Sequence, residues 1–265
     1  MSLLLIHTLF CSLMMCIAWR WQCRIKDAGI VDVTWAALMS LIAISYAINL
    51  NGDFATRVVV GLIMGLWYSR LAIFLYKRVK HDQNIGRGED GRYKNLREYW
   101  GDKANFYHFF FFQFQALLVM IFTLPAFVIS QQQTTQTHYL IMGLGITILA
   151  FIGVRISDKQ LYEFRASEEN NGKVCDRGLW KYSRHPNYFF EWLHWFAYPV
   201  IAIGTTYAIY LWLAPVLMLL FLYFITGIPH TERQAIQSRG QHYINYQKTT
   251  SAFFRGFQKV FKILF

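Results

Sequence analysis

Charged side chains are scarce in this sequence. Asp, Glu, Lys and Arg make up 15% of its 265 residues, whereas apolar residues make up 55% and aromatic residues 18%. An ordinary soluble domain has about a quarter charged residues and an apolar share of about one half. The composition therefore excludes a typical soluble domain and predicts an integral membrane protein.

Several signatures of metal proteins and soluble enzymes are also missing. Cys11, Cys16, Cys23 and Cys175 show no C-x-x-C or metal-ligand spacing, so we expect neither disulfides nor a structural metal. There is no H-E-x-x-H or G-x-S-x-G pattern, which disfavours nucleophilic hydrolysis. The glycine-rich stretch 86–93 fits neither the phosphate-loop nor the dinucleotide-fold signature, both of which need strands that the pattern does not predict.

What the sequence does contain is a series of long apolar stretches. A helix needs roughly 20 apolar residues to cross the hydrocarbon layer. Seven stretches approach this length, at 3–19, 30–50, 55–76, 106–129, 139–156, 188–204 and 207–228. We predict an all-α polytopic membrane protein with seven transmembrane helices. No repeat or Pro/Gly-rich linker divides the chain, so we expect one domain over 1–265.

The distribution of Lys and Arg predicts the orientation of these helices. Basic residues gather in the first, third and fifth connections and in the tail, and only Arg57 and Arg70 fall outside this alternation. Because basic loops stay in the cytoplasm, we expect the N-terminus outside and the C-terminus in the cytoplasm. The stretch 3–19 lacks the basic start and cleavage site of a signal peptide, so we expect it to be retained.

The net charge of +11 is spread over four membrane-proximal segments, so we expect membrane lipid rather than nucleic acid as a partner.

The segment 176–191 combines basic, imidazole, amide and phenol groups directly before an apolar stretch. Arg184, His185, Asn187 and Tyr188 supply donors suited to phosphate and amide groups, and an arginine can hold an oxyanion through two parallel N–H bonds. This pattern indicates a polar cofactor pocket at the membrane edge. The alternative is a basic loop that only sets topology and contacts anionic lipid.

Ionisable residues within predicted spans need a partner or a purpose because their insertion costs about 3 kcal/mol. Asp32 and Arg70 lie at similar predicted depth, so they are candidates for a structural ion pair. The functional alternative makes Asp32 a proton donor or an orienting carboxylate. Farther along, helical spacing puts Asp158 and Arg165 on one face, where they could read one ligand or form a plain surface pair.

Several motifs together resemble the membrane reductases of the steroid 5-alpha-reductase superfamily, and most closely a branch described only as a domain of unknown function. The resemblance extends over most of the chain, and its most specific part is 178–191. The supporting motifs are Ile30-Val-Asp-Val-Thr-Trp35, Leu66-Trp-Tyr-Ser-Arg-Leu71, Glu89-Asp-Gly-Arg-Tyr93, Ser157-Asp-Lys-Gln160 and Gly240-Gln-His-Tyr-Ile-Asn-Tyr246.

This resemblance implies a seven-helix fold that binds NADPH from the cytoplasm and reduces a carbon–carbon double bond in a lipophilic substrate such as a steroid enone. It also implies roles for individual residues. Those assigned to the cofactor, including the segment residues named above, are Arg70, Arg87, Arg92, Asp158, Arg165, Tyr182, Arg184, His185, Asn187, Tyr188, Glu191 and Tyr246. Asp32 and Tyr68 are the expected catalytic residues, although the family uses a Gln-Glu pair where this chain has Val31-Asp32.

Two other classes stay open. Arg-His-Pro-Asn-Tyr and the later Gly-x-x-Tyr-x-x-Tyr also resemble the S-adenosylmethionine-dependent membrane methyltransferases that act on prenylated cysteine or phospholipid. Those enzymes usually carry paired acidic residues where this chain has Thr231-Glu232. A non-catalytic lipid-binding or scaffold protein descended from such enzymes is the third class.

Overall fold

The computed structural model describes residues 2–86, 88–225 and 227–253, and these residues form helices and no strand. The chain consists of two compact units, residues 1–135 and 136–265. We call them unit 1 and unit 2 and describe each by itself. The prediction of a single domain stays a prediction.

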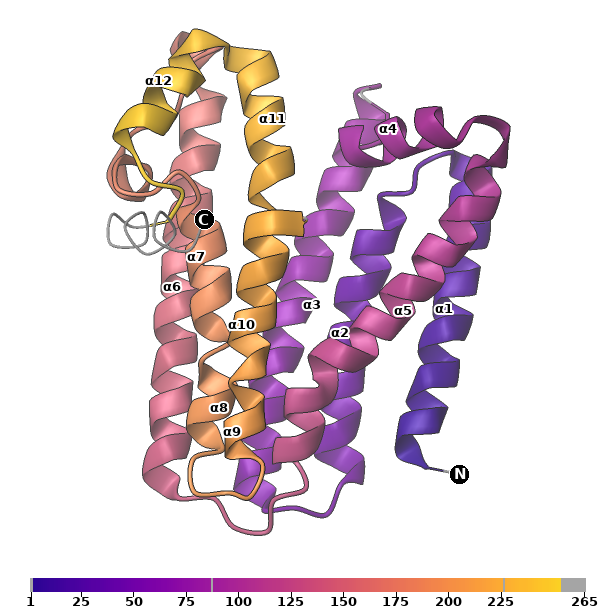
Figure 1. The fold of residues 1–265 in the computed structure, drawn as a ribbon, viewed down its shortest axis with the longest axis vertical. Coiled ribbons are helices and arrows are strands. Elements are labelled where there is room, and N and C mark those ends of the chain that lie inside the picture. Colours follow the sequence, from indigo (N-terminus) through magenta and orange to yellow (C-terminus); the bar gives the residue numbers. More distant parts are fainter. Residues whose placement is uncertain (1, 87, 226, 254–265) are drawn as a thin grey trace. The chain divides into compact units, whose positions relative to one another are not determined.

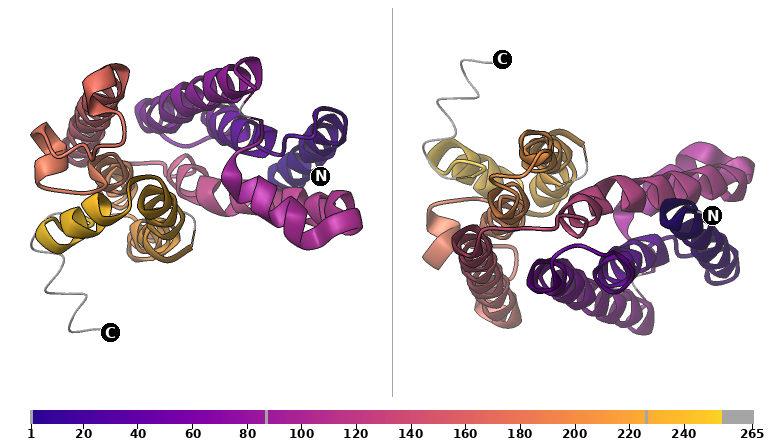
Figure 2. Two further views of the ribbon diagram at one scale, coloured as in Figure 1. Left: turned by 90° about the horizontal axis from the view of Figure 1, so that it is seen from above. Right: turned by 90° about the horizontal axis from the view of Figure 1, so that it is seen from below.

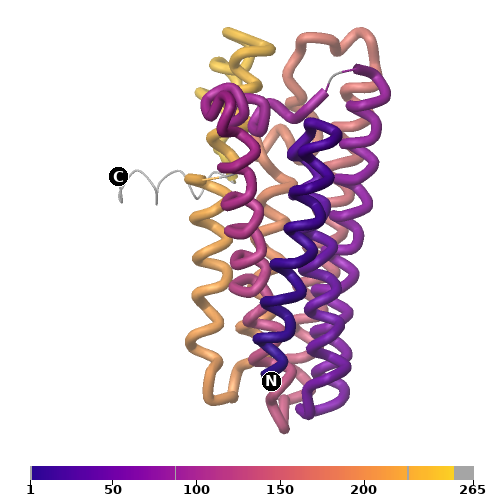
Figure 3. The backbone as a smooth tube through the Cα atoms, turned by 90° about the vertical axis from the view of Figure 1, so that its right-hand side faces the viewer, coloured from indigo at the N-terminus to yellow at the C-terminus, as the bar shows by residue number. Residues whose placement is uncertain are grey.

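Unit 1 is a bundle of long helices whose successive members alternate in direction, as the tube in Figure 3 shows. Its elements are α1 (Leu3–Ile25), α2 (Ile30–Asn49), α3 (Phe54–Asn84), α4 (Gly91–Trp100), η1 (Gly101–Lys103) and α5 (Ala104–Ile129). The short helix α4 lies across the end of the bundle where α2 begins and α3 ends (Figure 1). The view from above in Figure 2 shows it crossing the ends of the long helices of its unit.

Small residues let α2 and α3 approach closely. A Cβ added at Gly61 would lie 2.6 Å from the Cβ of Ala47, and the Ser40 hydroxyl donates to the Gly65 carbonyl at 2.8 Å. Small side chains and interhelical hydroxyl bonds are the usual means of helix association in a membrane, where lipid is as apolar as leucine. This pair forms the most extensive helix contact of unit 1.

Unit 2 is built on one long helix. Its elements are α6 (Thr137–Ala166), η2 (Glu168–Asn170), η3 (Gly178–Lys181), α7 (Pro186–His194), α8 (Ala197–Ile201), α9 (Ala208–Leu211), α10 (Leu213–Leu220), η4 (Phe221–Ile225), α11 (Ile228–Arg239) and α12 (Gln241–Thr249). Both α7 and α8 pack along α6. A Cβ at Gly153 would lie 2.3 Å from the ring of Phe190, so only glycine admits this packing.

Two prolines explain why the apolar stretches of unit 2 are broken into short helices. Pro199 has no N–H for the carbonyl of Trp195, which lies in the turn between α7 and α8. Pro215 likewise cannot donate to the carbonyl of Leu211, the last residue of α9. The chain bends at both places instead of continuing one helix.

Six helical stretches of the described residues are long and apolar enough to cross a membrane. They are Leu3–Ile25, Ile30–Asn49, Phe54–Asn84, Gly91–Ile129, Thr137–Ala166 and Ala208–Arg239. The predicted stretch 188–204 is not among them because it is divided between α7 and α8. The helical membrane fold is thus supported, while the count of seven and the orientation stay predictions.

Candidate functional site

In unit 2, the segment just before α7 pairs with a segment near the end of the described chain. The Arg184 amide donates to the Ser251 carbonyl at 2.9 Å, and the His185 amide donates to the Ala252 carbonyl at 3.1 Å. We call residues 250–253 the C-terminal strap. Two adjacent backbone bonds hold the strap beside the start of α7.

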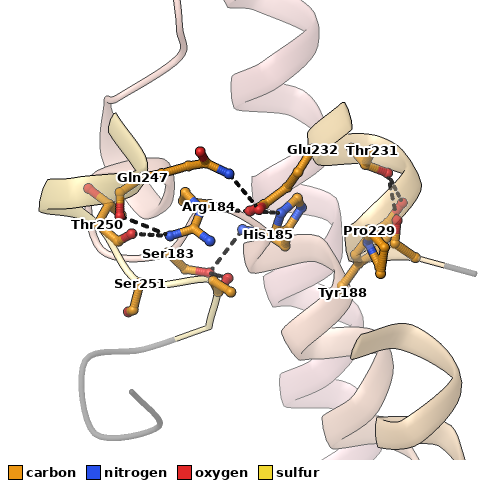
Figure 4. Close-up of polar contacts among 12 residues, drawn as sticks. Ser183, Arg184, His185, Tyr188, Pro229, Thr231, Glu232, Gln247, Thr250 and Ser251 are labelled. Carbon is orange, nitrogen blue, oxygen red and sulfur yellow. Dashed lines mark hydrogen bonds and ion pairs between the residues drawn. The ribbon is translucent and has the colours of Figure 1, made fainter. Parts of the chain in front are cut away.

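One carboxylate joins three segments of unit 2 (Figure 4). Oε1 of Glu232, on α11, accepts from Arg184 Nε at 2.7 Å and from His185 Nε2 at 3.0 Å. Oε2 accepts from Gln247 Nε2, on α12, at 2.7 Å. We call these four residues the Glu232 hub. The side chains of Arg184, His185 and Glu232 are 10%, 3% and 14% exposed, so the hub is largely shielded from water.

Burial controls the charge of His185. It lowers the pKa of the imidazole, although the hydrogen bond that the imidazole donates to Glu232 acts in the opposite direction. A neutral imidazole that bonds a carboxylate must carry its proton on Nε2. The ring also stacks on Tyr188 with 5.4 Å between centroids, and the Tyr188 hydroxyl lies 3.1 Å from Thr231 Oγ1. Arg184 and Glu232 are therefore the charged pair of the hub.

Tyr246, a predicted cofactor residue, bonds the turn that precedes α7. Its buried hydroxyl donates to the carbonyl of Trp180 and, at 3.2 Å, to that of Ser183. Burial raises the pKa of Tyr246, so the phenol keeps its proton at neutral pH. The side chain fixes the turn around η3 in this structure.

The structure brings Asp158 and Asn187 into contact. Asn187 Nδ2 lies 3.4 Å from Asp158 Oδ1, a long bond between α7 and α6. Asn187 Oδ1 accepts from the Tyr188 amide at 3.0 Å. Both side chains are half-buried, and their amide and carboxylate groups suit the hydroxyl and amide groups of a ligand.

The other predicted residues of unit 2 lie outside the hub. Arg165 is exposed on α6, two turns beyond Asp158. Tyr182 is 59% exposed next to η3, and Glu191 is half-buried on α7.

A cavity of about 300 Å³ opens between the end of α6 and η3. Arg177 stacks over the ring of Phe164, with 5.0 Å from its guanidinium carbon to the ring centroid, and both residues line the cavity. The full lining is Gln160, Glu163, Phe164, Ser167, Glu169, Asn170, Cys175, Arg177 and Gly178. The α6 residues of this lining are Gln160, Glu163 and Phe164. They lie on a different face of the helix from Asp158, because each residue along a helix is rotated by about 100° from the one before.

In unit 1, Asp32 lies in a group of charged and phenolic side chains. Its two oxygens accept from Tyr93 at 2.6 Å and from Arg92 at 2.8 Å. Asp90 binds Arg92 at 3.0 Å and Arg78 at 3.3 Å. We call these five residues the Asp32 cluster. Burial would raise the pKa of Asp90, but the bonds and charge of Arg92 outweigh burial and lower it.

The partner seen for Asp32 is thus Arg92 rather than the expected Arg70. Both oxygens of Asp32 accept hydrogen bonds, as an ionised carboxylate does. This geometry favours an orienting carboxylate over a proton donor.

The remaining predicted residues of unit 1 lie on α3 or outside the described residues. Tyr68 is buried with its ring 5.5 Å from that of Trp35. Arg70 lies over the ring of Trp67 at 5.3 Å. Arg87 lies outside the described residues.

A second carboxylate ties α4 to the turn between α1 and α2. Glu89 binds Arg97 through two bonds of 2.8 and 2.9 Å and accepts from the Ala28 amide at 2.7 Å. Arg97 also donates to Gln22 on α1 at 3.0 Å. The geometry of this end of unit 1 therefore depends on Glu89 as well as on Asp32.

Sequence reasoning assigned no role to Glu232, Gln247, Tyr93, Glu89 or Arg97. Signals for some of them were present. Glu89 and Tyr93 begin and end the Glu-Asp-Gly-Arg-Tyr motif, and Glu232 belongs to the Thr231-Glu232 pair that the sequence comparison with methyltransferases singled out. Gln247 gave no signal, because its bond to Glu232 depends on how α12 packs against α11.

Within the described residues, no group of three His, Cys, Asp or Glu side chains could hold a metal ion. The family described as "Protein of unknown function (DUF1295)" matches residues 18–250. No curated protein and no solved structure matches the chain.

Proposed function

This chain belongs to the DUF1295 family, and we propose that it is a membrane-embedded NADPH-dependent reductase of a carbon–carbon double bond in a lipophilic, enone-like substrate. One observation carries the proposal. Residues that the sequence resemblance assigns to the cofactor come together at one end of unit 2, where Asn187 contacts Asp158 and Tyr246 bonds the turn before α7. Folding joins positions that the motifs leave far apart.

The chemistry divides between cofactor and protein. NADPH would supply the hydride, and the protein would supply orientation and electrostatics. Asp158 and Asn187 offer a carboxylate and an amide for hydroxyl and carboxamide groups, and exposed Arg165 offers a guanidinium for phosphate. Asp32, which accepts from Tyr93 at 2.6 Å and from Arg92 at 2.8 Å, would orient the group that polarises the substrate's carbonyl.

The proposal includes a topology. We place the N-terminus outside and the C-terminus in the cytoplasm, because the basic connections alternate with neutral ones. This orientation requires an odd number of spans. We therefore propose that α7 and α8 together form one additional span, a broken helix, which raises the number from six to seven. Broken helices are tolerated in membranes where neighbouring helices satisfy the freed backbone groups. The cofactor site would then face the cytoplasm.

A second candidate is an S-adenosylmethionine-dependent methyltransferase. The observation that favours it is Glu232, which lies where the related methyltransferases carry acidic residues and which bonds Arg184 and His185 of the Arg-His-Pro-Asn-Tyr motif. The Asp158 and Glu89–Tyr93 motifs favour the reductase.

Titration of the purified full-length protein with NADPH and, separately, with S-adenosylmethionine distinguishes the two candidates. We expect NADPH to bind. Asn187→Ala and Arg165→Ala should each weaken it by about 1–3 kcal/mol, as expected for lost buried or charged hydrogen bonds. Asn245→Ala and Arg233→Ala, both exposed in unit 2, are the matched controls. Tight binding of S-adenosylmethionine alone would overturn the reductase.

A further inference from the structure

The Glu232 hub leaves Arg184 poorly suited to hold a ligand's phosphate. Arg184 Nε donates to Glu232 at 2.7 Å, and Nη1 donates to the carbonyls of Thr250 at 2.5 Å and Gln247 at 3.3 Å. Three bonds and one opposite charge are thus already committed within the chain. A phosphate that used this arginine would have to compete with a carboxylate that is only 14% exposed.

His185 is committed in the same way. Its Nε2 bonds Glu232 at 3.0 Å, its backbone amide bonds the strap, and its side chain is 3% exposed. Burial favours the neutral imidazole, which removes the positive charge that would attract an anion. Neither basic residue of the motif therefore presents a free cation to a ligand.

Both residues do hold the start of α7. Pro186 is the first residue of α7, so the helix begins directly after the hub. Asn187 follows at the second position, where its amide reaches Asp158 on α6. Any rotation of the segment 184–185 would move Asn187 with it, because only one residue separates them.

We infer that Glu232 is a positioning residue, which holds Arg184 and His185 so that α7 presents Asn187 beside Asp158 to the bound cofactor. This inference rests on the proposed function for the identity of the ligand. On this inference, Arg184 and His185 hold the start of α7 in place instead of contacting a phosphate. The C-terminal strap helps to hold the same segment. Sequence separation hides this role, since Glu232 lies 48 residues from Arg184.

The two roles of Arg184 predict opposite results for Glu232→Ala. If Arg184 held a phosphate directly, removing the competing carboxylate would leave NADPH binding unchanged or make it tighter. If Glu232 positions α7, the same variant weakens NADPH binding by about tenfold or more, the equivalent of one lost charged hydrogen bond. Glu168→Ala removes an equal charge from an exposed position of η2 and should bind NADPH as the wild type does.

A double-mutant cycle makes the test sharper. Arg184→Ala and Glu232→Ala should each weaken NADPH binding, and the double variant should be no weaker than the worse single variant, because both act through one contact. Additive losses would mean that Arg184 also touches the ligand and would overturn the inference. Glu232→Gln keeps one oxygen that can accept from Arg184 and His185 but removes the negative charge, so it should restore only part of the affinity.

Hydrogen exchange of the full-length protein tests the support without any ligand. The Arg184 and His185 amides, which bond the Ser251 and Ala252 carbonyls, should exchange faster in Glu232→Ala and at the wild-type rate in Glu168→Ala. Gln247→Leu, which removes only the Oε2 bond, should show a smaller increase and serves if Glu232→Ala does not fold. Unchanged exchange in both hub variants would overturn the inference.

Failure of the inference and failure of the proposed function are distinguishable. A wild type that binds S-adenosylmethionine but not NADPH ends the reductase proposal, and the same cycle is then run with S-adenosylmethionine. A wild type that binds neither leaves the exchange measurement to decide the positioning role.

Discussion

The Asp32 cluster and the Glu232 hub differ in how they pair their charged side chains. Each brings carboxylates and guanidinium groups together beside an apolar helix, and each joins segments that are distant in sequence. In unit 1 the charges are shared, since Arg92 bonds both Asp32 and Asp90, and their side chains are 24–29% exposed. In unit 2 a single carboxylate serves Arg184, His185 and Gln247 and is less exposed.

This difference predicts how sensitive each unit is to the loss of a single charged side chain. Loss of one member of the Asp32 cluster leaves its neighbours with other partners and with access to water. Loss of Arg184 or Glu232 leaves a shielded charge without its counterion, which costs more than the pair itself contributes. The hub should therefore be the more sensitive of the two to single substitutions.

The largest effect is expected for Arg184→Leu. It leaves Glu232 shielded and without its opposite charge, so the free energy of unfolding should fall by about 3 kcal/mol. Denaturant unfolding of the detergent-solubilised protein measures this. Lys159→Leu is the control, because Lys159 pairs with Glu163 in an exposed pair on α6 that contributes little. Equal losses in the two variants would contradict the comparison.

Asp32→Asn should affect chemistry rather than cofactor binding. If Asp32 orients the group that polarises the substrate, turnover should fall by about a hundredfold, the range for a positioned acid or base. Single-turnover oxidation of NADPH by a steroid enone measures the rate, and titration measures NADPH affinity, which should not change. Asp102→Asn, on exposed η1, is the control. Wild-type turnover would restrict Asp32 to a structural role.

Within unit 1, burial should again decide the size of the effect. Arg97→Leu leaves Glu89, whose side chain is 7% exposed, without its two bonds and should lower the free energy of unfolding by about 2 kcal/mol. Arg78→Leu removes the partly exposed contact with Asp90 and should cost about 0.5 kcal/mol. The reverse order would show that exposure does not govern this end of the unit.

The smallest effect is expected from the pH dependence of the hub. The pKa of His185 is lowered in the folded protein, so below about pH 6.5 the unfolded chain binds a proton that the folded chain does not. This contribution is absent above that pH, and stability should decline as the pH falls below it. Between pH 7 and pH 5, the free energy of unfolding should therefore fall more steeply for the wild type than for His185→Gln. Parallel pH dependence in the two proteins would argue against a neutral buried imidazole.

The helices were largely predictable because length and polarity are local properties. The stretches at 3–19, 55–76, 106–129 and 139–156 all lie within helices of the structure, and 30–50 extends one residue beyond α2. The stretch 188–204 was predicted as one helix because its composition is apolar, but Pro199 and the turn at Trp195 divide it. A hydropathy average does not register one missing backbone donor.

The candidate site was predictable in composition but not in its contacts. The motif around Arg184 indicated a cation-rich pocket, yet the structure shows Arg184 bonded to Glu232 and to strap carbonyls. Asp32 was expected opposite Arg70, and its observed partners are Arg92 and Tyr93. Pairing across 48 or 60 residues depends on how the helices pack, which the spacing of charges along the chain does not specify.

By itself, the sequence determined that this is a helical membrane protein with basic segments at the membrane edge, because both follow from the free energy of placing apolar and charged groups in lipid. Only the tertiary structure decided which carboxylate meets which guanidinium. An ion pair forms where packing holds two groups at hydrogen-bond distance and away from water, and that geometry belongs to the assembled helices of each unit.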